Sequence, residues 1–392
     1  MSPEPVASTE LPLALYIHMP WCVRKCPYCD FNSHGLKGMP DYPGYIDALL
    51  ADLEADLADF GLDRQPRPVT SLFFGGGTPS LFAPELIARL LEGVRQRLPL
   101  ADDAEITLET NPGTVEHGRF AGYRLAGINR ISFGIQSFDD AKLVRLGRIH
   151  SADEARAAFA EARAAGFDNI NLDLMYALPD QDLAGALADV EAAIALGPEH
   201  VSHYQLTLEP NTAFAAAPPP LPDDDAAWAM QEACQQRLAD AGYRQYEVSA
   251  YAREGRRCRH NLNYWSFGDY LGIGAGAHGK LSDPAAGWLR RRSKQRLPRT
   301  YLAAAGGPAR LGTDVDIPAD DRVFEYMLNS LRLIDGTPLQ QFPERTGLAL
   351  GHIATALAEA RARGWLEATP DRLQTTALGQ RFLNDVITHF MD

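Results

Sequence analysis

Six short apolar segments alternate with stretches of helical periodicity in the first half of the chain, and this alternation constrains the fold most. The apolar segments are residues 11–17, 70–74, 105–109, 130–135, 170–174 and 200–206. Ser151 and Glu154, between two of them, have the spacing of a capping box for a helix that ends at Gly166. Strands that alternate with helices pair in parallel through right-handed crossovers. The chain is therefore predicted to be an α/β protein with one parallel sheet, either open and doubly wound or curved into an incomplete barrel.

Polar residues stand just after these segments. Three cysteines follow the first segment, a GGGTP run at 75–79 follows the second, and Glu109 begins an ETNP run at the end of the third. Gln136, Asp173 and Thr207 stand at the ends of the last three. The carboxyl ends of the strands share one rim in a (β/α) barrel, and that rim carries the chemistry. This distribution favours the incomplete barrel over the open sheet.

The cysteines Cys22, Cys26 and Cys29 are spaced CxxxCxxC, which suits a cubane iron-sulfur cluster. Three thiolates bind three irons and leave the fourth open, whereas a cluster used only for electron transfer is normally held by four cysteines. The other two, Cys234 and Cys258, lie far down the chain. Zinc sites favour CxxC pairs and four ligands, and disulfides are rare in the reducing cytosol. The spacing predicts a 4Fe-4S cluster with one open iron.

An open iron needs a chelating ligand, and S-adenosylmethionine offers an amino group and a carboxylate. Glycines at 75–77 would let the backbone approach such an amino acid closely. Glu109 and Asp173 can accept hydrogen bonds from ribose hydroxyls or the ammonium group. Gln136 can donate and accept, and Arg148 can neutralise a carboxylate. Helix capping or a surface position would explain each of these residues equally well on its own.

Composition and charge limit the classes of partner that the chain can bind and the cell compartment in which we expect it. With 392 residues, 46% of them hydrophobic, the chain can form one large domain and a smaller one. The net charge of −14 argues against a nucleic-acid partner. Residues 1–10 have neither a basic region nor an apolar core, and no apolar run reaches the length of a membrane span. We expect a cytoplasmic protein without a signal peptide.

The remaining segments suggest a domain division. We expect a flexible N-terminus over residues 1–10, the barrel over 11–250, a connecting segment over 251–300 and a C-terminal domain over 301–392. The connecting segment has a glycine-rich run at 271–279, which predicts close backbone packing or a ligand-facing loop. Its six cations at 290–299 predict an interdomain linker or a docking surface for an acidic partner. Helices at 323–333, 348–363 and 378–390, with short strands around Trp365 and Leu373, predict a winged-helix-like domain of acidic charge, which argues against DNA binding.

Several motifs together resemble the radical S-adenosylmethionine superfamily, and its HemN/HemW branch in particular. They are YIHMPW at 16–21, CxxxCxxC, GGGTP and ETNP, and the resemblance extends over nearly the whole chain. It implies an incomplete (β/α)6 barrel with a C-terminal winged-helix-like α-rich domain, and a 4Fe-4S cluster on Cys22, Cys26 and Cys29. The residues that match the family's S-adenosylmethionine positions are Tyr16, Gly76, Gly77, Thr78, Glu109, Gln136, Arg148 and Asp173, with a weaker match at Thr207 and His278.

Two activities occur within that branch. Its coproporphyrinogen III dehydrogenases carry CxxxCxxCxC, but this chain has Phe31 in place of the last cysteine. Residues 260–265, HNLNYW, match the HNxxYW motif of the branch's haem chaperones. The resemblance thus implies a haem site of His260, Asn261, Tyr264 and Trp265. His260 would be an axial ligand and the aromatic rings would cover the porphyrin, although a packed loop would also account for the pattern.

The resemblance also implies the cofactors and partners. The cofactors would be the 4Fe-4S cluster, S-adenosylmethionine and haem. The chain would deliver haem to acceptor haemoproteins, such as those of the respiratory chain, and a homodimer is a further expectation. The cations at 290–299, if they form a docking surface, would bind the haem propionates or an acidic acceptor. The alternative is an oxygen-independent coproporphyrinogen III dehydrogenase that decarboxylates propionates. A scaffold with a vestigial site is a third hypothesis, against which the complete set of cysteines argues.

Overall fold

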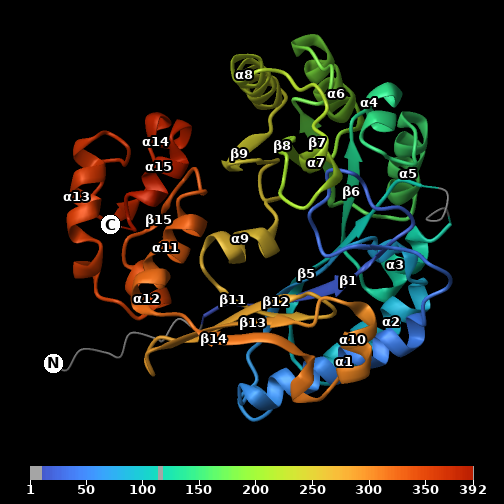
Figure 1. Ribbon diagram of the computed structural model, residues 1–392, viewed down its shortest axis with the longest axis horizontal. Helices are drawn as coiled ribbons and strands as arrows, with labels where there is room; N and C mark the ends of the chain where they lie inside the picture. Colours follow the sequence, from blue (N-terminus) through green and yellow to red (C-terminus); the bar gives the residue numbers. More distant parts are fainter. Residues whose placement is uncertain (1–10, 114–117, 392) are drawn as a thin grey trace.

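Six parallel strands form the centre of the fold. In the computed structural model, which describes residues 11–113 and 118–391, these strands are β1 (Leu13–Met19), β4 (Val69–Gly76), β5 (Leu100–Thr110), β6 (Arg130–Gln136), β7 (Ile170–Tyr176) and β8 (His200–Gln205). Each pairs in parallel with the next in this order. Figure 1 shows helices along the outer side of the curved sheet. The predicted α/β barrel is confirmed, and it is incomplete because β14 and β9 end the sheet without pairing to each other.

The crossover helices connect these strands, and several of them begin at a side-chain cap. They are α1 (Tyr42–Asp59), α2 (Pro84–Arg95), α3 (Phe120–Ala126), α4 (Asp140–Arg145), α5 (Ala152–Ala164) and α6 (Leu183–Leu196). The Asp41 carboxylate accepts a hydrogen bond from the Gly44 amide at the start of α1. Ser151 and Glu154 form both bonds of the capping box before α5. The periodicity of residues 115–126 predicts a helix, and α3 begins only at Phe120, since Gly118 and Arg119 are not helical. Residues 114–117 and 1–10 lie outside the described part.

The barrel strands direct apolar side chains outward and polar ones inward. On β6, Ile131, Phe133 and Ile135 are fully buried in the main core between the sheet and its helices. Arg130 and Ser132, which alternate with them, line a cavity on the inner face. Successive side chains of a strand point to opposite faces. The inner face of the barrel is therefore polar, which is what a binding site for charged cofactors requires.

Further strands widen the sheet at both edges. On the β1 side the order is β11 (Asp269–Ile273), β12 (His278–Asp283), β13 (Trp288–Lys294) and β14 (Leu311–Asp316), and beyond β8 lie β10 (Ala250–Ala252) and β9 (Arg244–Glu247). Strand β11 is parallel to β1, and β12 to β14 are antiparallel. The glycine-rich run falls on β11 and the turn after it, where a Cβ at Gly274 would lie 2.4 Å from the His18 carbonyl oxygen. Close backbone packing explains the glycine at 274, whereas Gly276 and His278 at the end of the run line a cavity.

The basic run is not a linker, contrary to expectation. Most of it is β13, and its side chains are paired with acids. Arg292 forms ion pairs with Asp56 at 3.0 Å and Asp314 at 2.9 Å, and Lys294, only 1% exposed, pairs with Asp56 at 2.7 Å and also with Asp52. The acids of α1 and β14 that neutralise these cations are far from them in sequence, so the composition of the run alone misled the prediction.

Shorter elements connect these parts. They are β2 (Trp21–Cys22), β3 (His34–Gly35), α7 (Ala213–Ala216), α8 (Asp224–Asp240), α9 (Arg259–Trp265), α10 (Pro298–Ala304), and 3-10 turns at Pro79–Leu81, Pro308–Arg310 and Leu350–His352. Helix α9 carries the HNLNYW motif and lies between the barrel and the C-terminal domain (Figure 1). No helix in the described ranges is both long and apolar enough to cross a lipid bilayer.

The C-terminal domain has a core of its own. Its elements are α11 (Ala319–Ser330), β15 (Thr337–Pro338), α12 (Gln341–Thr346), α13 (Ala354–Ala362), β16 (Arg372–Leu373), α14 (Ala377–Arg381) and α15 (Leu383–Thr388). Strand β16 pairs with β15, whereas the strand expected around Trp365 is only a bridge between Leu366 and Thr375. The predicted final helix is divided at Phe382. Sequence periodicity did not show these breaks.

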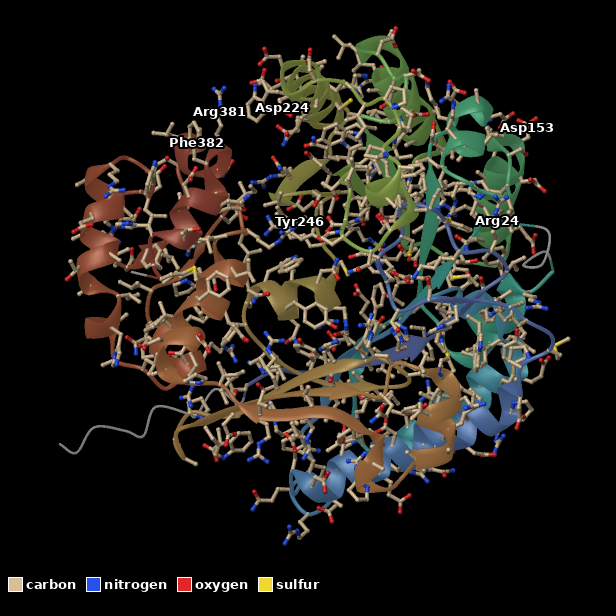
Figure 2. The ribbon with its side chains drawn as sticks, in the orientation of Figure 1. Arg24, Asp153, Asp224, Tyr246, Arg381 and Phe382 are labelled. Carbon is tan, nitrogen blue, oxygen red and sulfur yellow. The ribbon has the colours of Figure 1, made fainter. Side chains whose placement is uncertain are left out.

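Side chains join this domain to the barrel. Arg332 forms an ion pair with Glu247 at 3.0 Å, and the Ile334 amide donates to the Tyr246 carbonyl at 3.0 Å. The Arg381 guanidinium lies 4.9 Å from the centre of the Trp228 ring on α8. Figure 2 shows Arg381 on the side of the domain that faces α8, and Tyr246 near the middle of the molecule. The domain thus covers the open side of the barrel next to α9.

Candidate functional site

The three cysteines lie in the loop that follows β1, and all three line one cavity of about 140 Å³. Each is a free thiol that is partly buried. Burial raises the pKa of the Cys22 and Cys29 thiols, so both are protonated at neutral pH unless a metal binds. Cys29 Sγ lies 3.6 Å from Ser33 Oγ, and Arg148 Nη1 donates to Cys26 Sγ at 3.6 Å. Metal binding to this loop would displace protons from the thiols.

The donor set suits an iron-sulfur cluster better than a single ion. Within the described ranges, no three His, Cys, Asp or Glu side chains converge on one metal ion. A cubane cluster does not need such convergence, because each cysteine binds a different iron. Cys234 on α8 and Cys258 before α9 are fully buried and do not line the cavity. The three loop cysteines therefore fit three corners of a 4Fe-4S cluster, with the fourth iron left to another ligand.

The glycine turn after β4 is joined directly to the cysteine loop. The Gly77 amide donates to the Met19 carbonyl at 2.7 Å, and the Thr78 amide donates to the Trp21 carbonyl at 2.8 Å. A Cβ at Gly77 would lie 2.6 Å from the Trp21 oxygen, so only glycine fits there. The family-matched residues that line the small cavity with the cysteines are Gly76, Gly77, Thr78, Glu109, Gln136, Arg148 and Asp173.

Glu109, which lines this cavity, has a strongly raised pKa. Burial, followed by the nearby charge of Asp173, raises the pKa of Glu109 to about 8. The Gly76 amide donates to its carboxylate at 3.2 Å. At neutral pH the carboxyl group is thus mostly protonated, and a cationic ligand such as an ammonium or sulfonium group would favour its ionised form. Gln136, at the end of β6, has a φ of 74°, which is uncommon for a residue with a side chain and turns the backbone toward the cavity.

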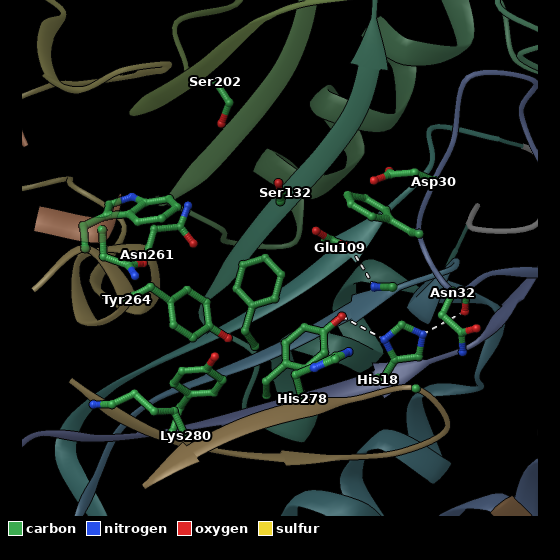
Figure 3. Close-up of a pocket in the computed structure, with 18 of the residues that line it drawn as sticks. His18, Asp30, Asn32, Glu109, Ser132, Ser202, Asn261, Tyr264, His278 and Lys280 are labelled. Carbon is green, nitrogen blue, oxygen red and sulfur yellow. Dashed lines mark hydrogen bonds between the residues drawn. The ribbon is translucent and has the colours of Figure 1, made fainter. Parts of the chain in front are cut away.

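A second cavity, of about 790 Å³, adjoins the first. Phe31, Gly76, Glu109, Ser132 and Asp173 line both. Figure 3 shows Asn261 and Tyr264 of α9 on one side of the larger cavity and Asp30 and Asn32 on the other. Its volume is in the range of pockets that hold drug-sized ligands and cofactors. The two cavities thus share a boundary that lies between the cysteine loop and the HNLNYW helix.

Tyr16 and His18 form a relay on the wall of the larger cavity. Tyr16 Oη donates to His18 Nδ1 at 3.0 Å, while His18 Nε2 donates to the Asn32 carbonyl at 2.9 Å (Figure 3). Burial lowers the pKa of His18 to about 4, which keeps the ring neutral. Tyr16 therefore lies at the larger cavity, among the residues that line it, rather than beside the cysteines.

His260 does not face the cavity, in contrast to the expected haem ligand. It is 1% exposed, and its ring stacks on Phe73 with centres 5.0 Å apart. Its Nδ1 is hydrogen-bonded to Ser71 Oγ at 3.0 Å and its Nε2 to Tyr264 Oη at 2.9 Å. Burial lowers the pKa of His260 to about 3, so the ring stays neutral. Both ring nitrogens are occupied, and the imidazole positions Tyr264 instead.

Other predicted residues are distributed between the cavities. Asn261, Tyr264, Trp265 and His278 line the larger one. No hydrogen bond joins the His278 ring to another described residue, and burial lowers its pKa. Thr207 is exposed, donates its hydroxyl proton to Glu209 at 2.7 Å and lines neither cavity.

Comparison with known proteins decides the family. Residues 16–190 match the model of the radical SAM superfamily, and residues 317–382 match the HemN C-terminal domain. The chain is 51% identical over 380 residues to the heme chaperone HemW of Escherichia coli (strain K12), with 97% of this chain and 98% of that protein covered. The HemW of Haemophilus influenzae is similar to the same extent, 51% over 380 residues. The chain belongs to the HemW family of the radical SAM superfamily.

This HemW-family chain is also similar to proteins with other names. It is 42% identical over 298 residues to the mitochondrial radical S-adenosyl methionine domain-containing protein 1 of Mus musculus, covering 75% of this chain and 65% of that protein. The solved structure of coproporphyrinogen III oxidase (HemN) from Escherichia coli superposes with a TM-score of 0.81 at 23% identity, over 97% of this chain and 90% of that one. That likeness establishes the shared fold.

The structure adds site residues that the sequence did not single out. The Asp173 carboxylate accepts hydrogen bonds from Ser132 Oγ at 3.2 Å, Asn171 Nδ2 at 2.7 Å and Tyr204 Oη at 2.9 Å. These side chains lie on three neighbouring strands of the HemW-family barrel. The signal was present in the sequence, since polar residues alternate with apolar ones along β6, β7 and β8, but only strand pairing shows that they meet.

Proposed function

We propose that this HemW-family chain binds haem beside a 4Fe-4S cluster and S-adenosylmethionine, and delivers the haem to acceptor haemoproteins. The observation that carries the proposal is that the two cavities adjoin and share lining residues, among them Glu109 and Asp173. The cysteines line the small one, and Asn261, Tyr264 and Trp265 of the HNLNYW helix line the large one. The relatives named heme chaperone cover nearly the whole chain, which supports the same conclusion.

The small cavity would hold the cluster and S-adenosylmethionine. Cys22, Cys26 and Cys29 would bind three irons, and the bound pair would supply one-electron chemistry. Arg148 would neutralise the cofactor's carboxylate, since its guanidinium already contacts Cys26. Glu109, with its pKa raised to about 8 by burial and Asp173, would give up its proton and accept from the ammonium group. The turn at 76–78 would supply backbone groups close to the cofactor.

The large cavity would hold the haem. Tyr264 and Trp265 would cover a porphyrin face, and the hydrogen bond from His260 would fix the Tyr264 ring. His278 would be the axial ligand, because the other cavity-lining histidine, His18, has both nitrogens engaged. This assignment replaces His260 as ligand and keeps its motif in the haem site.

The proposal also includes the haem acceptor, the oligomeric state and the cell compartment. A haem acceptor, for instance a respiratory haemoprotein, would receive the haem from the mouth of the large cavity. A homodimer and a cytoplasmic location are also proposed. Light scattering on the purified chain would give its oligomeric state, and fractionation of its host cells would give the compartment.

Anaerobic reconstitution followed by two assays tests the proposal. We expect stoichiometric haem binding, seen as a Soret band, and no protoporphyrinogen IX from coproporphyrinogen III with reductant and S-adenosylmethionine present. His278→Ala should shift the Soret band and leave the cluster absorbance intact. If protoporphyrinogen IX formed, the proposed chaperone function would be wrong, and the chain would be a coproporphyrinogen III dehydrogenase, an activity that occurs on this fold. Failure of the reconstituted chain to bind haem would reject the chaperone outright.

A further inference from the structure

One arginine on the floor of the larger cavity has no partner. Arg130 is the first residue of β6 and is only 2% exposed, yet its side chain lines the cavity. No hydrogen bond or ion pair joins it to any other residue in 11–113 or 118–391, and its Nε is buried without an acceptor. Charged side chains are almost never fully buried unless they are paired. A buried cation that lines a cavity and has no protein partner is typical of a residue that binds an anionic ligand.

Two other cations of the cavity, Lys280 and Arg291, already have partners, and a third, Arg296, is exposed to solvent. Lys280 donates to the carbonyls of Phe267 at 2.9 Å and Gly268 at 3.2 Å, and to Asp269 at 3.1 Å. The Arg291 guanidinium pairs with Glu325 at 2.7 Å. Lys280 and Arg291 therefore each have a structural role. Arg130 is buried like Lys280 but lacks the contacts that Lys280 makes.

Nearby acids keep Arg130 charged but form no ion pair with it within the described ranges. Burial lowers the pKa of Arg130, but its neighbours, among them Cys258, Glu105 and Asp173, raise it by more. One oxygen of Glu105 accepts from the Arg259 amide at 3.0 Å and the His260 amide at 3.2 Å, at the start of α9. Asp173 accepts from three other side chains. The guanidinium keeps its hydrogen-bond donors for a ligand.

The cavity beside Arg130 offers further donors. The indole Nε1 of Trp265 is buried without an acceptor, and the Asn261 amide makes no side-chain hydrogen bond within the described ranges. Both residues belong to the helix that we assign to haem. Donors without acceptors complement an acid, and a planar guanidinium binds a carboxylate through two parallel hydrogen bonds.

We propose that Arg130 anchors a carboxylate of the bound tetrapyrrole, a haem propionate, at the floor of the larger cavity. This inference rests on the proposed function and names the group that orients its ligand. S-adenosylmethionine also carries a carboxylate, but Arg130 lines the larger cavity and does not line the small one with the cysteines. Arg148, which lies beside Cys26, is the cation within reach of that cofactor.

The test compares haem with its dimethyl ester. Full-length protein with reconstituted cluster is titrated with both, in the same detergent, following the Soret band. We expect the diacid to bind roughly 10- to 100-fold more tightly than the ester, as for a hydrogen-bonded charge. Arg130→Gln should lose most of this preference, and Arg130→Lys should keep part of it. Arg299→Gln, the same change at an exposed position of α10, should leave the preference unchanged.

The outcomes separate this inference from the function on which it rests. Equal binding of diacid and ester by the unmodified chain would overturn the role of Arg130 while haem binding stands, and this comparison needs no variant. If Arg130→Gln weakened S-adenosylmethionine in equilibrium dialysis and left haem unchanged, Arg130 would belong to the other cofactor and the inference would be wrong. Absence of haem binding to the unmodified chain would reject the proposed function and this inference together.

Discussion

The two adjoining cavities are built in different ways. One wall of the small one is held by backbone: the Gly77 and Thr78 amides join the glycine turn to the cysteine loop by hydrogen bonds. The large one is made of side chains from β1, β6, β7, β8, α9 and β12, which are distant in sequence. The first tolerates little change because its backbone cannot move independently. A substitution in the large cavity should remove one hydrogen bond and weaken ligand binding only by the contribution of that bond.

The largest effect is expected at the cysteine loop. Cys26→Ser should abolish the cluster, because a hydroxyl does not replace a thiolate on iron. Iron and sulfide analysis after anaerobic reconstitution measures this. Cys234→Ser and Cys258→Ser are the matched controls, and both should retain full cluster content since neither lines the cavity. A full cluster in the Cys26 variant would end the assignment of these ligands.

A methyl group in the glycine turn should act almost as strongly. In Gly77→Ala the new Cβ would press on the Trp21 oxygen, 2.6 Å away in backbone that cannot yield without moving the cysteine loop. We expect a loss of about 1–3 kcal/mol in unfolding free energy, with little S-adenosylmethionine binding left. Thermal unfolding and equilibrium dialysis would show both. Gly351→Ala, where no atom lies within 4 Å of the added Cβ, should change neither.

An intermediate effect is expected at the helix of the large cavity. His260→Ala frees the Tyr264 hydroxyl and should weaken haem binding by about tenfold, the scale of one or two buried hydrogen bonds. The cluster spectrum should not change. Tyr264→Phe keeps the ring and removes the same hydrogen bond, so it should also weaken haem binding, but by less than His260→Ala. If His260→Ala removed haem completely while His278→Ala had no effect, His260 would be the ligand after all.

The pH dependence of S-adenosylmethionine binding should come from Glu109. Its pKa is raised to about 8, chiefly by burial and then by Asp173, so the carboxyl group is protonated below that pH and ionised above it. A cationic ligand prefers the carboxylate, so affinity should rise by about tenfold for each unit between pH 6 and pH 8 and then level off. Dialysis across this range measures it. Glu109→Gln should flatten the curve, and an unchanged slope in that variant would assign the proton to another group.

The smallest effect is expected on the basic strand. Arg290 is partly exposed and already paired with Asp316 at 3.1 Å, so Arg290→Gln should change the unfolding free energy by no more than about 0.5 kcal/mol. Haem transfer should also be nearly independent of ionic strength. A rate that falls steeply with added salt, and falls again in Arg290→Gln, would restore the docking surface that the composition of this run suggested.

The sequence by itself determined the six central strands, the cysteine loop and the glycine turn. Each depends on neighbours in the chain: alternation sets strands and helices, CxxxCxxC sets the spacing of the three thiols, and the Ser151 capping box sets a helix start. These signals are local, so they survive without knowledge of the fold. The break at Phe382 and the loss of the strand at Trp365 show that local signals fail where a short element depends on its packing partners.

Only the tertiary structure decided the partners of charged and aromatic side chains. It buried His260 between Ser71 and Tyr264, and it neutralised Lys294 with two acids of α1. It also left Arg130 unpaired within the described ranges, on the wall of a cavity that a helix 130 residues later completes. A buried polar group is stable or reactive according to what it meets in space. Its sequence neighbours do not carry that information, because strand pairing brings together residues from distant parts of the chain.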